Sequence, residues 1–333
     1  MTKTERLDWI DSAKGIGIFL VVYGHVARGL HAAGLPFELF EQIDKAIYAF
    51  HMPLFFTLSG YFFVKSSKKG INTYIKTKLA TILYPYLAWS LIQIVIQFFA
   101  SNYTNGNIGI DEVITFFMPR GQFWFLLALF FISVISIALY IKLGEKGLLI
   151  AICTSFMYTI INPEIPILDD TMKHLLFFNV GVHLYLNPVL KKTLVNDTKS
   201  LLVNCLLFTS LQYLLYCDLW QSNLFGIVIS ISGSLFIVQM CSLIKSPNNH
   251  FKKIGKQSMV IYILHILVAS GTRIFVSKLF HLDTVWVHCI VGTLLGVYVP
   301  FTLYKVGLIN RISFLFKYPV KNKLQITKNT SKN

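Results

Sequence analysis

The stretch from Gln122 to Ile141 reads QFWFLLALFFISVISIALYI, which is 20 residues without a charged side chain. A helix of this length spans the hydrocarbon core of a bilayer, because about 20 apolar residues are needed to cross it. Similar runs lie on both sides, at residues 13–30, 44–64, 79–100, 147–163, 172–188, 199–217, 221–244, 257–277 and 284–306. The sequence therefore predicts an all-α fold, a polytopic integral membrane bundle of about ten transmembrane helices.

The composition agrees with a lipid environment. Hydrophobic residues make up 55% of the 333 positions and charged residues only 14%. A water-soluble domain is about 25% charged. A chain of this length cannot hide so many apolar side chains in a water-soluble core, so lipid has to cover them.

The net charge of +15 is typical of a nucleic-acid partner in a soluble protein. Here it reports orientation instead. With the N-terminus placed inside, 24 of the 30 Lys and Arg residues fall on the cytoplasmic side of the predicted spans, as the positive-inside rule requires. We expect cytoplasmic N- and C-termini in a multi-pass protein of the plasma membrane, with no nucleic-acid partner. One membrane domain covers residues 1–316, and a basic, disordered cytoplasmic tail covers 317–333.

The cysteines give no sign of a metal centre. All five lie singly within predicted spans, and no Cys-x-x-Cys or His/Cys cluster has metal-ligand spacing. Buried packing is the expected role of these side chains, and no metal is expected.

The first predicted span carries ionisable groups that lipid should exclude, and such groups are candidates for function. Lys14 and His25 are eleven residues apart, a rotation of about 1,100° or three turns plus about 20°. They therefore share one face, roughly 16 Å apart along the axis. Asp11 lies within about 40° of the same face. The alternatives are a histidine hydrogen-bonded between helices and a lysine that only anchors the helix at the membrane surface.

The second predicted span brings another histidine to a comparable depth. His51 lies about as far above the cytoplasmic Lys65 as His25 lies above Lys14. Pro53 lacks a backbone N–H, so it should free a carbonyl oxygen near a polar cavity. Coincidence is the alternative to a shared chemical role.

Four motifs resemble one family along nearly the whole chain, from residue 6 to about 306. The spacing of Lys14 and His25 resembles the basic-x10-His signature of the membrane-bound acyltransferase family 3, in particular its fucose O-acetylase-like branch. The other three matches are F50-H-M-P-L-F-F-T-L-S-G-Y61, Q122-F-W-F-L126 and S258-M-V-I-Y-I-L-H265. Two departures stand out: the basic residue is Lys14 instead of the more frequent Arg, and Lys76 and Lys78 stand where the family often has Arg-x-x-Arg.

The resemblance implies transfer of an acyl group, most often acetyl, from acyl-coenzyme A to a hydroxyl of a cell-surface or lipid-linked carbohydrate. A sugar hydroxyl needs a base, and neutral imidazole suits that task near pH 7. His25 would be the general base or a relay that carries the acyl group, and His51 would orient His25 or stabilise the oxyanion. Asp11 would hold Lys14, and Lys14 with Lys76 and Lys78 would attract the phosphates of the donor, acetyl-CoA.

Other residues have two interpretations each. Trp124 and Tyr61 are candidates for stacking on a sugar or for packing, and His265 for lining the donor entrance. Arg120 and Arg273 would contact the acceptor or form structural pairs. A transporter or flippase for a lipid-linked saccharide is the alternative function, and a noncatalytic membrane scaffold is the third. Neither explains the spacing of Lys14 and His25 together with the later motifs.

Overall fold

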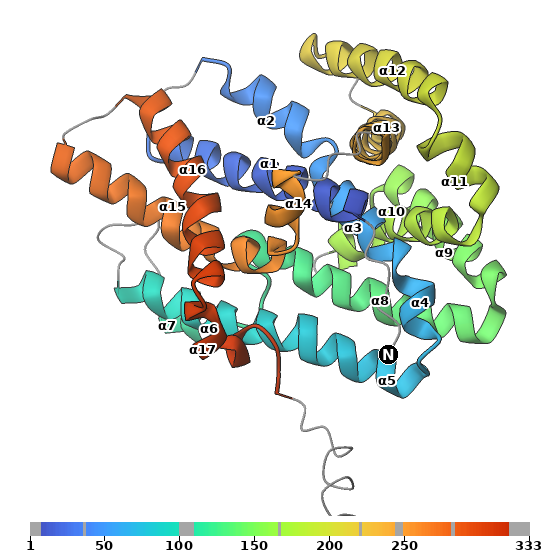
Figure 1. Cartoon of the computed structure of the whole chain (residues 1–333), viewed down its shortest axis with the longest axis horizontal. Coiled ribbons are helices and arrows are strands. Elements are labelled where there is room, and N and C mark those ends of the chain that lie inside the picture. Colours follow the sequence, from blue (N-terminus) through green and yellow to red (C-terminus); the bar gives the residue numbers. More distant parts are fainter. Residues whose placement is uncertain are drawn as a thin grey trace, which may run out of the picture.

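The computed structural model describes residues 8–35, 38–99, 110–165, 168–219, 222–243, 249–280 and 284–319. Within these ranges all regular structure is helical, and no strand occurs (Figure 1). The predicted all-α class is therefore confirmed. The longer helices are α1 (Asp8–Ala32), α6 (Tyr84–Phe99), α8 (Trp124–Leu143), α9 (Glu145–Ile161), α10 (Leu168–Leu186), α12 (Thr198–Tyr216), α13 (Asn223–Leu243), α15 (Ser258–Phe280) and α16 (Val285–Lys305).

Shorter helices connect these or extend them. They are α2 (Phe40–Tyr48), α3 (His51–Tyr61), α4 (Phe63–Ser67), α5 (Ile71–Lys78), α7 (Ile110–Ile114), α11 (Pro188–Val195), α14 (His250–Gly255) and α17 (Leu308–Arg311). A π-helical turn at Leu79–Leu83 joins α5 to α6, and a 3-10 turn at Gly121–Phe123 precedes α8.

Among the described residues, six helical segments are long and apolar enough to cross a membrane. They are Asp8–Ala32, Ile71–Phe99, Gly121–Leu143, Asn223–Leu243, Ser258–Lys278 and Val285–Lys305. The other four predicted spans, at 44–64, 147–163, 172–188 and 199–217, are helical over most of their length. Ten spans with both ends in the cytoplasm stay a prediction.

The end of the described chain packs onto α6. Tyr318 donates its backbone N–H to the carbonyl oxygen of Ala80 at 3.0 Å, and Trp89 donates its indole N–H to the carbonyl of Leu315. The described contacts therefore extend to Tyr318, and the boundary of the tail at residue 317 stays a prediction. The rest of the predicted disordered tail, 320–333, lies outside the described residues.

Helix α1 is the central helix of the bundle. It packs against α2, α3, α13, α14, α15 and α16, and Figure 1 shows these helices around it. In its most apolar window 67% of the residues are buried, against 33% in Ser258–Lys278. The residues of α1 therefore face other helices more than lipid. This explains how α1 carries Asp11, Ser12 and His25, since polar groups within a membrane protein need partners inside the bundle.

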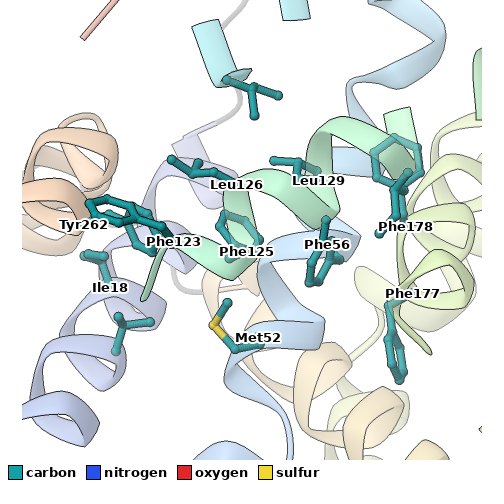
Figure 2. Packing of buried hydrophobic residues seen from close by; sticks show 14 of the residues in the cluster. Ile18, Met52, Phe56, Phe123, Phe125, Leu126, Leu129, Phe177, Phe178 and Tyr262 are labelled. Carbon is teal, nitrogen blue, oxygen red and sulfur yellow. The ribbon is translucent and has the colours of Figure 1, made fainter. Parts of the chain in front are cut away.

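An aromatic core joins helices α3, α8 and α15 (Figure 2). The ring of Phe125 on α8 packs at 4.9 Å from Phe56 on α3 and at 5.6 Å from Tyr262 on α15. The Tyr262 hydroxyl donates to the carbonyl oxygen of Gln122. The Gln122 amide pairs in turn with Gln93 of α6 at 2.7 Å. The Q122-F-W-F-L126 motif thus holds α3, α6, α8 and α15 together.

Helices α3 and α10 touch through their backbones. A Cβ added at Gly60 would collide with the carbonyl oxygen of Phe178, and one added at Gly181 would collide with the carbonyl oxygen of Thr57. Small residues allow such close approach between helices in membrane proteins. The two glycines therefore fix the register of α3 against α10.

The helix is interrupted between α2 and α3, at Ala49 and Phe50. Pro53 cannot donate to the carbonyl oxygen of Ala49, four residues earlier, because it has no backbone N–H. The carbonyl oxygen of Ala49 therefore has no backbone N–H donor at that position, as predicted. The hydroxyl of Ser230 on α13 donates to it instead, at 2.5 Å. Ser234 donates to the next carbonyl, that of Phe50, at 3.4 Å.

Replacing Ser230 with Ala tests this partnership. We expect Ser230→Ala to lower the free energy of unfolding by about 1 kcal/mol, because a buried carbonyl loses its donor. Ser210→Ala is the matched control, since Ser210 is exposed and bonds only within its own helix. Adding Pro53→Ala to the Ser230 variant restores an N–H donor and should recover part of the loss. Equal unfolding curves for the two serine variants in detergent micelles would contradict this account.

Candidate active site

Two histidines meet inside the bundle. His25 of α1 and His265 of α15 have ring centroids 5.1 Å apart. His265 is fully buried, and its Nδ1 lies 2.7 Å from the carbonyl oxygen of Tyr262 and 3.2 Å from that of Ile261. A carbonyl oxygen only accepts, so Nδ1 carries the hydrogen and Nε2 keeps its lone pair. Among the described residues Nε2 of His265 has no hydrogen-bond partner, so it is available for chemistry beside His25.

The first turns of α1 are covered by α14. Gly15 and Gly255 let the two backbones touch, because a Cβ at either position would collide with the backbone of the other helix. The contact is also held by side chains, since Asn249 donates to Ser12 at 2.9 Å. Lys252 forms an ion pair with Asp8 at 2.5 Å. The basic helix α14 thus packs on the beginning of α1, the part that contains Asp11 and Lys14.

Lys14 lies in the first half of α1, eleven residues before His25. Its ammonium group sits 5.2 Å from the centre of the Phe62 ring, and Asp11 is buried. Near this end of α1, α14 and the residue that follows it bring three further lysines, Lys252, Lys253 and Lys256. In the sequence analysis these three lysines count only toward the orientation of the chain in the membrane. The sequence feature that could have placed them near Lys14 is the pair of glycines, Gly15 and Gly255, which permits α1 and α14 to touch.

His51 reaches α1 through two other residues. Its Nδ1 donates to the carbonyl oxygen of Ile47 at 2.8 Å, and its ring packs edge-on against Tyr48 at 4.5 Å. The guanidinium of Arg28 covers the ring of Tyr48, 3.2 Å from its centroid. Arg28 also binds Asp44 through two hydrogen bonds of 2.7 and 2.8 Å. Because Arg28 is one helical turn beyond His25, His51 is connected to the neighbourhood of His25 by this chain of contacts.

A pocket of about 750 Å³ opens beside His51. Its walls come from the α2–α3 break and from α8, α9, α10, α12 and α13. The lining residues that matter below are Lys45, Trp124, Asp170, Lys173, His174 and Asn223. The size is that of a typical small-molecule site. Trp124 lines this pocket, and its contact with a ligand stays a prediction.

The comparisons with known proteins agree with the four motifs. A family model described as an acyltransferase domain, acyltransferase family 3, matches residues 7–305. This chain belongs to acyltransferase family 3. A stretch of 80 residues is 36% identical to nodulation protein NolL of Mesorhizobium japonicum (strain LMG 29417 / CECT 9101 / MAFF 303099). That stretch is 24% of this chain and spans about a fifth, 21%, of the relative's length. No solved structure matches.

The family and the apolar helices together indicate a membrane protein. In this member of the family, sequence reasoning missed His174, which lines the pocket. Its ring stacks on Phe56 at 4.6 Å and lies 5.2 Å from Trp124. The signal was present, because an ionisable group within a predicted span is a functional candidate. The same argument that selected His25 applies to His174.

The remaining predicted residues of the acyltransferase lie elsewhere. Tyr61 accepts a hydrogen bond from Lys191 at 2.8 Å and packs edge-on against Trp9 at 5.3 Å. It is not among the residues that line the pocket. Lys76 is exposed on α5, and Lys78 lies 5.1 Å from the ring of Tyr74 on the same helix. Helix α5 packs on α4 and α8, so the structure does not bring these two lysines to α14.

The two arginines of the acyltransferase that were assigned to the acceptor each have a protein partner. Arg120 donates to the Thr115 hydroxyl at 2.8 Å. Arg273 donates to the carbonyl oxygen of Gly29 at 3.0 Å, near the end of α1. Both bonds agree with the structural alternative, and contact with an acceptor stays a prediction.

Proposed function

We propose that the protein transfers an acetyl group from acetyl-CoA to a hydroxyl of a cell-surface or lipid-linked carbohydrate. The observation that carries the proposal is the pairing of His25 with His265 inside the bundle. The unpartnered Nε2 of His265 can accept a hydrogen bond from one nitrogen of His25. This contact would fix the orientation of the His25 ring and leave the other nitrogen as the base.

The chemistry needs a base at the acceptor hydroxyl. The hydroxyl oxygen forms a bond with the acyl carbon as its proton passes to His25. The acyl–sulfur bond then breaks, and the coenzyme A sulfur leaves with the electron pair and is protonated. In the alternative order His25 first carries the acyl group and the hydroxyl attacks it there. His51 would support either order, since its ring packs on Tyr48, which Arg28 of α1 covers in turn, and these contacts hold α3 near His25.

The donor's phosphates would bind at the α14 end of α1. Lys14, Lys252, Lys253 and Lys256 gather there, and cations attract phosphate oxygens strongly. Asp8 neutralises one of them, Lys252. Lys76 and Lys78 would form a separate basic region on α5. The positive-inside pattern supports a cytoplasmic position for the α14 end, where acetyl-CoA is available, in a multi-pass protein of the plasma membrane.

Lys14→Ala tests the donor side. We expect the KM for acetyl-CoA to rise about tenfold or more, the factor that corresponds to the loss of one charge-assisted hydrogen bond. Acetyl-pantetheine lacks the nucleotide phosphates, so its KM should be equal in the variant and the natural protein. Lys142→Ala, on α8, is the control for a general loss of positive charge. A similar KM increase for both donors would contradict phosphate binding by Lys14.

One assay tests the proposed function directly. Protein purified in detergent micelles is mixed with acetyl-CoA, with and without extracted surface glycans, and the free thiol is measured. We expect thiol release that depends on the glycan, together with acetyl esters on the glycan by mass spectrometry. Movement of a lipid-linked saccharide across proteoliposomes without thiol release would support the transporter instead.

A further inference from the structure

The helices that form the walls of the pocket are not the helices that carry His25 and His265. Among the described residues, none of its lining residues belongs to α1, α14, α15 or α16. Helix α14 packs at Gly15, whereas Tyr48 of the pocket wall contacts α1 at Gly24 and Arg28. The pocket therefore lies toward the opposite end of α1 from the cations proposed to bind the donor.

The two lysines that line the pocket, Lys45 and Lys173, are both paired with carboxylates. Lys45 forms an ion pair with Asp218 at 2.8 Å, and Lys173 forms one with Asp169 at 2.7 Å. Each lining lysine thus already has a carboxylate partner. Asp170 adds another carboxylate, and burial raises its pKa from the usual value. Such a pocket offers no net attraction to a phosphate or a uronate, so its lining favours an uncharged ligand.

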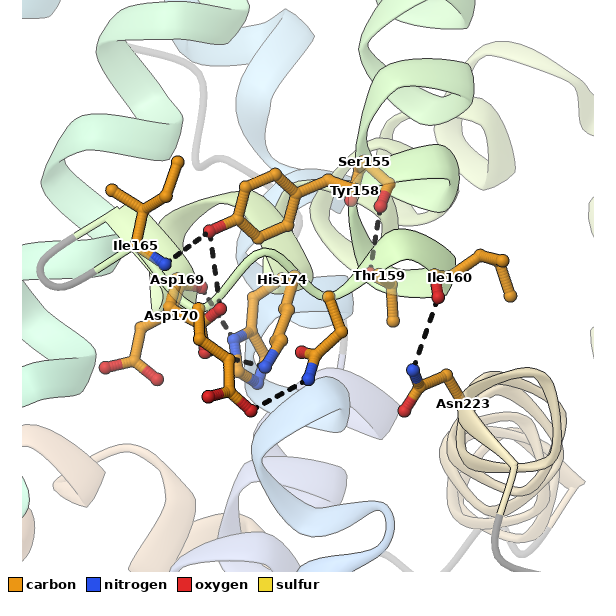
Figure 3. Close-up of polar contacts among 12 residues, drawn as sticks. Ser155, Tyr158, Thr159, Ile160, Ile165, Asp169, Asp170, His174 and Asn223 are labelled. Carbon is orange, nitrogen blue, oxygen red and sulfur yellow. Dashed lines mark hydrogen bonds and ion pairs between the residues drawn. The ribbon is translucent and has the colours of Figure 1, made fainter.

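The polar groups suit hydroxyls. His174 donates from Nδ1 to the carbonyl oxygen of Asp170 at 2.7 Å, which leaves Nε2 as the nitrogen that accepts. Figure 3 shows His174 next to Asp170, and Asn223 apart from both, where its amide donates to the carbonyl oxygen of Ile160 at 3.4 Å. A carboxylate accepts hydrogen bonds, and an amide both donates and accepts. The pocket therefore presents acceptors at His174 and Asp170 and a donor at Asn223.

The aromatic groups suit the face of a ring. Trp124 is half-buried in the wall and lies 5.2 Å from the His174 ring. Ligand pockets combine such apolar surfaces with a few placed polar groups that fix orientation. The C–H face of a pyranose is apolar, whereas its edge carries hydroxyls.

We propose that this pocket binds a neutral sugar ring of the acceptor, with Trp124 against one face and His174 and Asp170 accepting hydrogen bonds from its hydroxyls. The inference rests on the proposed function for the identity of the ligand as acceptor. It adds the position of that ligand, its lack of charge and three residues that select it. The occupied pocket would hold the carbohydrate beside His51 and the Arg28 turn of α1, within the bundle half that contains His25.

Sugar binding is measured without the donor, by saturation-transfer NMR on the full-length protein in micelles. The probes are the methyl glycosides of galactose, N-acetylglucosamine and fucose, with glucuronate and glucose 6-phosphate for comparison. We expect at least one neutral glycoside to bind. Its affinity should fall about five- to tenfold in Trp124→Ala and in His174→Ala, as one lost contact of this kind predicts. Trp286→Ala is the matched control, because Trp286 is an exposed tryptophan on α16.

The outcomes separate this inference from the proposed function. His25→Ala should keep sugar binding and lose acetyl transfer. Binding that survives in both pocket variants, or falls equally in Trp286→Ala, overturns the pocket assignment alone. Binding of no neutral glycoside, or tighter binding of the two anionic probes, also overturns it. Pocket-dependent sugar binding without any transfer to glycans would instead reject the proposed function and leave the pocket assignment standing.

Discussion

His25→Ala is expected to lower the rate of acetyl transfer by a factor of about 10²–10⁴, the usual contribution of a general base. The reason is geometric: His25 is the histidine of α1 that meets His265 inside the bundle, on the same helix as the proposed donor site at Lys14. The rate is measured as thiol release from acetyl-CoA in the presence of glycan. A relay role is separated from a base role by incubation with radiolabelled acetyl-CoA alone, because only a relay retains label on the protein.

The control for this variant lies on the same helix. His31→Ala removes an exposed histidine whose ring stacks on Phe40 at 4.3 Å, and its transfer rate should stay within about twofold, as expected for a surface change. Both variants should elute from gel filtration as the natural protein does. Near-normal acetyl transfer by His25→Ala would contradict the assignment of His25 as base or relay, whatever the other variants show.

Gly60→Val is expected to have the largest effect on stability. Its side chain would occupy the position of the Phe178 carbonyl oxygen, and a backbone group on a packed helix cannot turn away as a flexible side chain can. Helices α3 and α10 would have to separate, at a cost of about 3 kcal/mol or more. We expect a much lower midpoint of thermal unfolding in micelles, and low yield of folded protein.

Gly271→Ala is the matched control for that variant. A Cβ at Gly271 on α15 meets no atom within 4 Å, and alanine is a better helix former than glycine by about 1 kcal/mol. The control should therefore unfold at the same temperature or slightly higher. If Gly60→Val and Gly271→Ala have the same midpoint of thermal unfolding, the close approach of α3 and α10 does not limit stability.

The sequence predicts well what depends on one helix. Periodicity alone places Lys14 and His25 on one face of α1, and the missing N–H of Pro53 predicts a free carbonyl oxygen. It does not predict which helix provides the partner. His265 and Ser230 come from α15 and α13, more than 180 residues along the chain, and helix periodicity contains no information about their place beside α1 or Ala49.

Aromatic residues show the second limit of the sequence. Trp124 and Tyr61 look alike as candidates, since each is an aromatic side chain in a family motif. Trp124 lines a pocket, whereas Tyr61 packs between Trp9 and Tyr185. An aromatic ring is equally suited to a core and to a ligand. Only the tertiary packing decides between the two.

The separation of the pocket walls from α1, α14 and α15 has a consequence for how relatives of this enzyme diversify. Substitutions in α2, α9, α10 and α13 can alter the pocket while the histidine pair and the basic end of α1 keep their contacts. Distant sites of this kind usually contribute additively. Under the proposed assignments, a directed-evolution library confined to the pocket walls would be the starting point for new regioselectivity, and exchange of α14 would be the starting point for a new donor.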